Sequence, residues 1–134
     1  MQYEVKVNKA ALSKALAARK NGTATWNARG EYGAHQITLG VVADYAAAVY
    51  QEHRADKTQL RIMAVNEYDA IVAWHLDRCL YHGQNHCEKY NEDELVDFVA
   101  RAWKYGIRGA ISGYGDKDPY RFHVLNLYHK YCQE

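Results

Sequence analysis

Histidine and cysteine side chains recur in this chain at spacings that suit a metal ion. His75 and Cys79 are four residues apart, and a second pair, His129 and Cys132, is three residues apart. On a helix each pair would share a face, and imidazole and thiolate are common zinc ligands. The spacings match no zinc finger or ribbon, and the sequence leaves open whether the two pairs meet. Buried cysteines and a hydrogen-bonded core histidine are the simpler interpretation, so we expect no metal site and no cofactor.

Other residue types that carry chemistry are present without the partners that they need. Cys87 follows His86, but a neighbouring base does not supply the oriented third group of an activated nucleophile. The carboxylates of residues 92–97 lie where the first turn of a helix would stabilise negative charge. The glycine-rich segment 106–115 fits neither a P-loop nor a dinucleotide fingerprint. We therefore predict no catalytic residue and expect a protein that is not an enzyme.

Aromatic and basic residues provide the remaining signal, and they gather in a predicted hairpin and around the glycine-rich segment. Tyr, Trp and Arg dominate protein–protein hot spots because each buries a large area while keeping a polar group. The same residue types hold single-stranded nucleic acid, since rings stack on bases and cations follow phosphates. The predicted partner-binding residues are Trp26, Arg29, Tyr32, Lys104, Arg108, Tyr114, Lys117 and Arg121.

Apolar residues at helical spacing predict about five helices. The clearest extends from Asn66, as N-cap, to Gly83, as the residue that ends the last turn. Its buried face would consist of Tyr68, Ile71, Val72, His75, Leu76, Cys79 and Leu80. The other helices are expected at residues 9–20 after an Asn8 cap, from 41 to an end near residues 53–56, and at 91–105 with an Asn91/Glu94 capping box and a stop at Gly106. A final helix is expected after Asp118 as its cap and Pro119 as its first residue.

Alternating and β-prone residues predict three or four short strands. Alternation at residues 3–7 and 60–64 indicates strands with one buried face. The runs 23–28 and 35–39 flank residues 29–33, which indicates a hairpin. Because no repeat or linker interrupts the chain, the predicted fold is α+β, with residues 1–134 in a single compact domain that combines about five helices with a small sheet.

Composition narrows the class of protein. With one proline and 49% hydrophobic residues in 134, the chain has the composition of a folded domain. Its apolar runs fall well short of the roughly 18 residues that a membrane span needs, so we expect no membrane association. Three cysteines, an odd and widely spaced number, do not form a disulfide framework and fit a reducing compartment. We expect a cytoplasmic location.

Charge favours a protein partner. The net charge is +1, with six Lys and Arg against one acid in residues 1–30, five against twelve in 31–100 and six against three in 101–134. A near-neutral chain with twelve tyrosines suits a protein surface better than a nucleic acid duplex, which calls for a strongly basic face. We expect a small non-enzymatic binding protein that docks onto a protein complex. The alternatives are a single-stranded nucleic-acid-binding protein, a zinc-binding protein or enzyme that uses the His/Cys pairs, and a homodimer through the aromatic surface.

As a general kind, compact chains without a recognised motif resemble phage or mobile-element proteins that inhibit a host defence system, including anti-CRISPR inhibitors. The resemblance comes from size and the lack of motifs and from no particular residue of this sequence. It implies that the partner is a host complex and that the chain acts by binding it.

Overall fold

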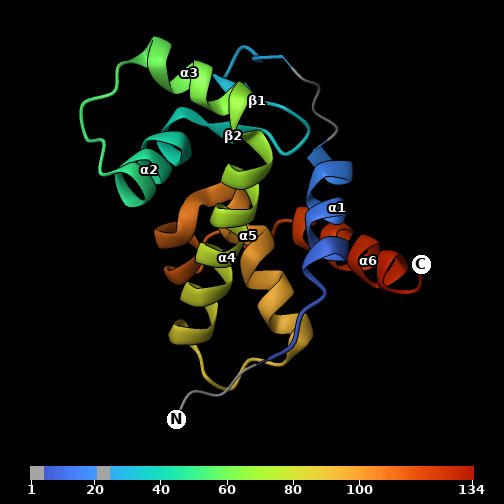
Figure 1. Ribbon diagram of the computed structural model, residues 1–134. Coiled ribbons are helices and arrows are strands. Elements are labelled where there is room, and N and C mark those ends of the chain that lie inside the picture. The colour runs from blue at the N-terminus through green and yellow to red at the C-terminus, as the bar shows by residue number, and fades with distance from the viewer. Residues whose placement is uncertain (1–4, 21–24) are drawn as a thin grey trace. The chain divides into compact units, whose positions relative to one another are not determined.

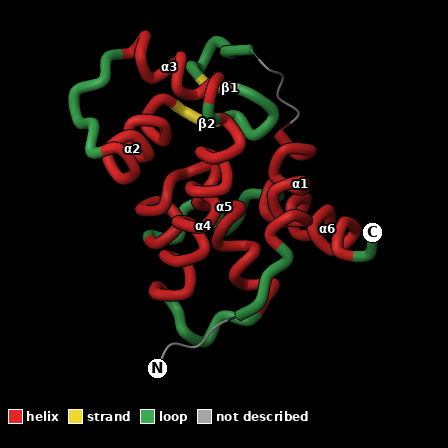
Figure 2. Tube along the Cα trace, viewed as in Figure 1, coloured by secondary structure: helices red, strands yellow, loops and turns green. Residues whose placement is uncertain are grey.

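The computed structural model describes residues 5–20 and 25–134, and most of them are helical (Figure 1). In this part of the chain there are six helices and one small antiparallel sheet of two strands (Figure 2). In chain order the elements are α1 (Lys9–Lys20), β1 (Glu31–Tyr32), β2 (Ile37–Thr38), α2 (Leu39–Tyr50), α3 (Lys57–Asn66), α4 (Tyr68–His86), α5 (Glu92–Ile111) and α6 (Tyr120–Cys132).

The chain divides into two compact units. One comprises Met1–Arg19 together with Leu76–Glu134, and the other comprises Lys20–His75. The first unit contains α1, the second half of α4, α5 and α6, and the second unit contains the hairpin, α2, α3 and the first two turns of α4.

The first unit is built on four helices that share one hydrophobic core. Asn8 begins α1 as predicted, because its side-chain Oδ1 accepts a hydrogen bond from the backbone N–H of Ala11 at 3.0 Å. Tyr128 on α6 is fully buried, and its hydroxyl accepts a hydrogen bond from the backbone N–H of Asn8 at 3.0 Å. The largest fully buried side chains of this core are Leu12, Leu16, Cys79, Leu95, Val96, Phe98, Val99, Val124 and Tyr128.

Helix α4 has the predicted buried face but not the predicted ends. Ile71, Val72, His75, Leu76, Cys79 and Leu80 are all buried, and Tyr68 is half-buried. Asn66 is the last residue of α3 instead of the cap of α4, and Gly83 lies inside α4 instead of ending it. Both predicted ends of the helix were wrong. Asn and Gly are common at helix ends, but neither residue type is restricted to the position that the prediction gave it.

Packing explains why Gly83 is inside a helix. A Cβ atom at Gly83 would lie 2.7 Å from Cδ1 of Leu95 and 2.8 Å from Cδ1 of Phe98. Both neighbours are buried, on α5. The missing side chain therefore lets α4 and α5 approach closely, which sequence spacing alone does not reveal.

Helix α5 begins as predicted and continues further than predicted. Asn91 Oδ1 accepts from the backbone N–H of Glu94 at 2.9 Å, and Glu94 Oε1 accepts from that of Asn91 at 3.2 Å, which completes the capping box. Gly106 does interrupt the helix, with φ 83° and ψ 160°, but residues 107–111 are helical again. The glycines of residues 107–115 would suit a short strand or a loop, but the first half of this segment is helical.

The second unit replaces a predicted strand with a helix. Residues 60–64 belong to α3, in which Leu60 and Ala64 are buried four residues apart. Asp56 caps α3 and forms a capping box with Gln59, because each accepts a hydrogen bond at 2.8 Å from the backbone N–H of the other. This Asp-x-x-Gln signal is readable in the sequence and favours a helix, although the spacing of residues 60–64 also fits a strand.

The sheet is smaller than predicted. β1 and β2 pair antiparallel, and Trp26 forms an isolated bridge with Tyr32, so the hairpin exists with strands of two residues each. Residues 5–7 form no strand, although Val5 and Val7 are half-buried and Lys6 is exposed. Tyr3 of the same predicted strand, and the predicted helix stop at Asn21-Gly22, lie outside the described residues.

Candidate binding surface

The predicted partner-binding residues fall into both units. Trp26, Arg29 and Tyr32 belong to the hairpin in the second unit, whereas the other five belong to the first unit and lie in the second half of α5, in the segment after it and in the first turn of α6. The two groups are therefore separate candidates.

The hairpin residues are mostly engaged within their own unit. The rings of Trp26 and Tyr32 lie 5.0 Å apart, and the Arg61 guanidinium lies 5.4 Å from the Trp26 ring. Tyr32 also meets Tyr68 of α4 edge-on at 5.7 Å. Trp26 and Tyr32 are half-buried, while Arg29 is exposed and pairs with Glu31 at 3.2 Å. These aromatic rings hold the hairpin on α3 and α4.

Tyr68 of α4 makes several contacts with this hairpin. Its hydroxyl accepts a hydrogen bond from the backbone N–H of His35 at 2.7 Å. Gly33 has φ 79°, and a Cβ atom there would lie 2.4 Å from Cε1 of the Tyr68 ring. Burial raises the pKa of Tyr68, which keeps its hydroxyl protonated. The aromatic cluster of the hairpin is thus accounted for by packing.

In the first unit, two of the predicted cations are neutralised by internal ion pairs. Lys104 Nζ lies 2.6 Å from Asp118 Oδ2, and Arg121 Nη1 lies 3.0 Å from Asp97 Oδ1. Arg121 is also largely buried, with 23% of its side chain exposed. Lys104 and Arg121 therefore stabilise the unit and are poorly placed to meet a partner.

The other three predicted residues are exposed. Tyr114 is 65% exposed, and Arg108 and Lys117 are also exposed. Among the described residues, neither of these two cations has an ion-pair partner. Their charges are thus available to solvent or to a partner, unlike that of Lys104.

A second exposed tyrosine, which the prediction did not include, extends this surface. Tyr105 is 41% exposed, and it and Tyr114 flank Gly109: a Cβ atom there would lie 3.1 Å from Cβ of Tyr105 and 3.3 Å from Cδ2 of Tyr114. Ile111, at the end of α5, is 42% exposed. We call this set the α5–α6 surface and define it as Tyr105, Arg108, Ile111, Tyr114 and Lys117.

Asp118 organises the base of this surface. Its carboxylate accepts hydrogen bonds from Lys104 Nζ at 2.6 Å, from the Tyr105 hydroxyl at 2.5 Å and from the backbone N–H of Tyr120 at 2.9 Å. These donors hold the pKa of Asp118 well below its usual range, and the hydrogen bond from Lys104 has the largest effect. The prediction of Asp118 as the cap of the last helix was wrong, because Pro119 is the N-cap of α6 and Asp118 lies one residue before it, although it accepts a hydrogen bond from the first residue of the helix.

Comparisons with known proteins leave the residues as the only guide to function. No family model, no curated protein and no solved structure matches this chain.

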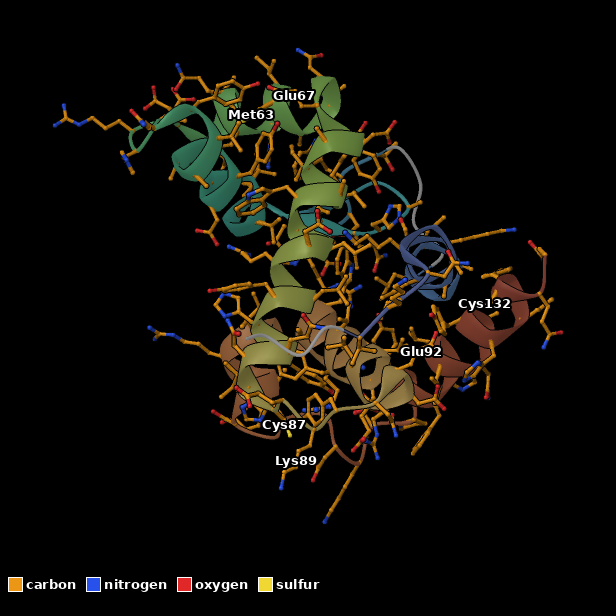
Figure 3. All side chains as sticks on the ribbon, turned by 60° about the horizontal axis from the view of Figure 1, so that its bottom comes forward. Met63, Glu67, Cys87, Lys89, Glu92 and Cys132 are labelled. Carbon is orange, nitrogen blue, oxygen red and sulfur yellow. The ribbon has the colours of Figure 1, made fainter. Side chains whose placement is uncertain are left out.

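The histidine and cysteine pairs show no metal-binding geometry. Within residues 5–20 and 25–134, no group of three or more His, Cys, Asp or Glu side chains could hold a metal ion. Cys79 is fully buried, and burial raises the pKa of its thiol to about 12. Figure 3 shows Cys87, in the loop after α4, well apart from Cys132 at the end of α6. His129 lies 2.9 Å from Asp93.

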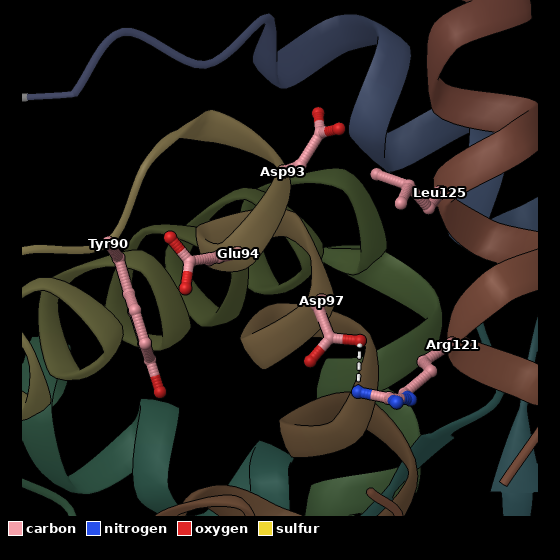
Figure 4. A pocket seen from close by; sticks show the side chains of 6 residues that line it. All are labelled: Tyr90, Asp93, Glu94, Asp97, Arg121 and Leu125. Carbon is pink, nitrogen blue, oxygen red and sulfur yellow. Dashed lines mark hydrogen bonds and ion pairs between the residues drawn. The ribbon is translucent and has the colours of Figure 1, made fainter. Parts of the chain in front are cut away.

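One pocket of about 330 Å³ lies between α5, α6 and the loop before α5 (Figure 4). Its carboxylates already have partners: Asp97 pairs with Arg121, Asp93 with His129, and Glu94 belongs to the capping box. The lining residues are Tyr90, Asp93, Glu94, Asp97, Arg121 and Leu125.

None of the helices formed by the described residues is long and apolar enough to cross a bilayer.

Proposed function

We propose that this protein is a non-enzymatic binding protein that docks onto a protein partner through the α5–α6 surface. The observation that carries the proposal is the pair of exposed tyrosines, Tyr105 and Tyr114, beside Arg108 and Lys117, for which the described part of the chain provides no ion-pair partner. Tyrosine suits such a role because its ring buries a large area at the cost of two rotatable bonds, while its hydroxyl can hydrogen-bond.

Charge and apolar content indicate the chemistry of the partner. Arg108 and Lys117 would form ion pairs with carboxylates on the opposing surface, and the exposed side chain of Ile111 would pack against an apolar group there. Asp116 lies in the same segment and would repel phosphate. We therefore place a protein with an acidic and partly apolar patch ahead of single-stranded nucleic acid.

We further propose a biological setting, in which the chain is a phage or mobile-element inhibitor of a host defence complex, anti-CRISPR-like in its action. This part of the proposal rests on the lack of a catalytic motif in these 134 residues. Inhibition by docking requires only a binding surface, so no further chemistry is needed.

The test is an affinity capture of the tagged chain from source-cell lysate, with and without nuclease, followed by mass spectrometry and reconstitution with the purified partner. Tyr114→Ala and Arg108→Glu should each lower the affinity for that partner by about tenfold or more, since central aromatic and arginine residues dominate interfaces. Two controls match these changes: Tyr81→Ala, at a tyrosine of 58% exposure, and Lys130→Glu, which like Arg108 lies in the last turn of a helix.

Two results would overturn the proposal. If the partner were lost on nuclease treatment, the nucleic-acid alternative would replace it. If the partner bound the Tyr114 and Arg108 variants as tightly as the Tyr81 and Lys130 variants, docking would use a different surface.

A further inference from the structure

The segment that carries the α5–α6 surface is tied down at both sides by polar side chains. On one side, Asp118 receives three hydrogen bonds, two of them from the adjacent α5 residues Lys104 and Tyr105. These two residues come directly before Gly106, where α5 is interrupted. The carboxylate therefore bridges the start and the end of the segment 106–118.

On the other side, the buried Arg101 reaches the same segment. Its guanidinium Nη1 donates to the backbone carbonyl of Ala110 at 2.9 Å and also contacts the carbonyl of Tyr114 at 3.5 Å. Its Nε donates to Asp97 at 3.1 Å. Because Arg101 is only 7% exposed, these bonds form away from bulk water, where an unpaired charge would be costly.

Backbone conformations inside the segment also depend on this arrangement. Gly106, Gly113 and Gly115 all have φ between 83° and 89°, a region that side chains disfavour. At Gly115 a Cβ atom would lie 2.6 Å from Cε2 of Tyr105 and 3.2 Å from Cγ of Arg101. The segment thus packs directly against Arg101 and against Tyr105, whose hydroxyl donates to Asp118.

We infer that Asp118 and Arg101 are positioning residues, which keep the α5–α6 surface in its binding conformation before the partner arrives. The inference rests on the proposed function of that surface. Glycine-rich segments pay a large entropy cost when they become ordered, and a surface that is already ordered avoids this cost during binding. Neither residue needs to touch the partner to affect its affinity.

Amide hydrogen exchange on the full chain tests the positioning role without any partner. Asp118→Ala should speed exchange at the amides of Tyr114, Asp116 and Asp118, which bond within the segment, by about tenfold or more. Asp116→Ala is the matched control, because it makes the same change in net charge at an exposed residue that has no ion pair among the described residues. Amides of α1 should be unaffected, which shows that the unit remains folded.

The same variants then separate positioning from contact. With the purified partner, Asp118→Ala should lower the affinity by about tenfold, whereas Asp116→Ala should change it by less than about threefold. Tyr114→Ala should lower the affinity while leaving exchange in α1 and at the amide of Asp118 unchanged. Arg101→Met should speed exchange at the amide of Tyr114 as Asp118→Ala does.

Failure of this inference is distinguishable from failure of the proposed function. Unchanged exchange in the Asp118 and Arg101 variants would overturn the positioning role even if a partner is found. Faster exchange with unchanged affinity would also overturn it. If the Tyr114 variant binds normally but Asp118→Ala still speeds exchange, the proposed surface is wrong and the inference about its positioning falls with it.

Discussion

Gly83 lies inside a helix because the site has no room for a side chain. Glycine in the interior of a helix is less favourable than alanine by about 1 kcal/mol. At Gly83 this cost is offset because the absent side chain leaves room for Leu95 and Phe98 on α5. The position is governed by packing between helices and not by the conformation of its own helix.

Gly83→Ala is therefore expected to destabilise the protein. The added Cβ atom would overlap buried neighbours, and overpacking of this kind costs about 1–3 kcal/mol in the free energy of unfolding. Urea denaturation followed by circular dichroism measures it. Gly40→Ala is the control, because Gly40 also lies in a helix but has only Thr38 Oγ1 within reach, at 3.6 Å. Equal stabilities for the two variants would contradict the packing explanation.

At the scale of elements, Asp118 connects two helices, because its carboxylate bonds to the backbone of Tyr120, the first residue of α6, and to the side chains of Lys104 and Tyr105 on α5. Its three donors stabilise the ionised carboxylate, so its pKa in the folded protein lies below the unfolded value. The resulting stabilisation is fully present above the unfolded pKa, near 4, and is lost as the pH falls through the folded pKa.

Because the pKa of Asp118 is lowered by folding, the stabilisation by its carboxylate should depend on pH. At about pH 7 Asp118→Asn should be less stable than the native chain, and the difference should shrink as the pH falls below about 4, because protonation makes the native side chain neutral as well. Urea midpoints at several pH values measure the difference. Asp116→Asn should show no comparable pH-dependent difference. A constant deficit for Asp118→Asn at every pH would mean that the charge of Asp118 contributes nothing.

At the scale of the whole molecule, the distribution of charge is less basic than the ends of the sequence indicate. Lys9 pairs with Asp77 at 2.9 Å and Lys14 with Glu134 at 2.6 Å, and Lys104 is neutralised by Asp118. Single-stranded nucleic acid needs cations that follow successive phosphates. The ion pairs of Lys9, Lys14 and Lys104 neutralise part of the positive charge that such binding would use.

We therefore expect no binding of a fluorescein-labelled oligothymidine in a polarisation titration at about 50 mM salt, where phosphate contacts are strongest. A basic single-strand-binding protein run in parallel verifies the probe. Tight binding that weakens steeply as salt is raised would favour the nucleic-acid alternative over a protein partner.

Several local features of this protein were determined by the sequence alone. The Asn8 cap, the Asn91/Glu94 capping box and the buried face of α4 were all predicted, whereas Gly106 was predicted to end α5 and only interrupts it. Each depends on interactions between residues a few positions apart, which spacing and residue type describe well. The prediction of an α+β fold with about five helices and three or four strands was confirmed in part, since the described residues are mostly helical, with six helices and one sheet of two strands.

Tertiary structure decided what local patterns leave ambiguous. Residues 60–64 satisfy both strand and helix spacing, and the contacts of Leu60 and Ala64 within a helical unit settled the choice. Likewise, Arg108 and Lys104 are both basic residues on α5, yet only Lys104 meets a carboxylate, fourteen residues later in the chain. Which cations are neutralised, and so which remain for a partner, depends on such long-range contacts, because only folding brings those groups together.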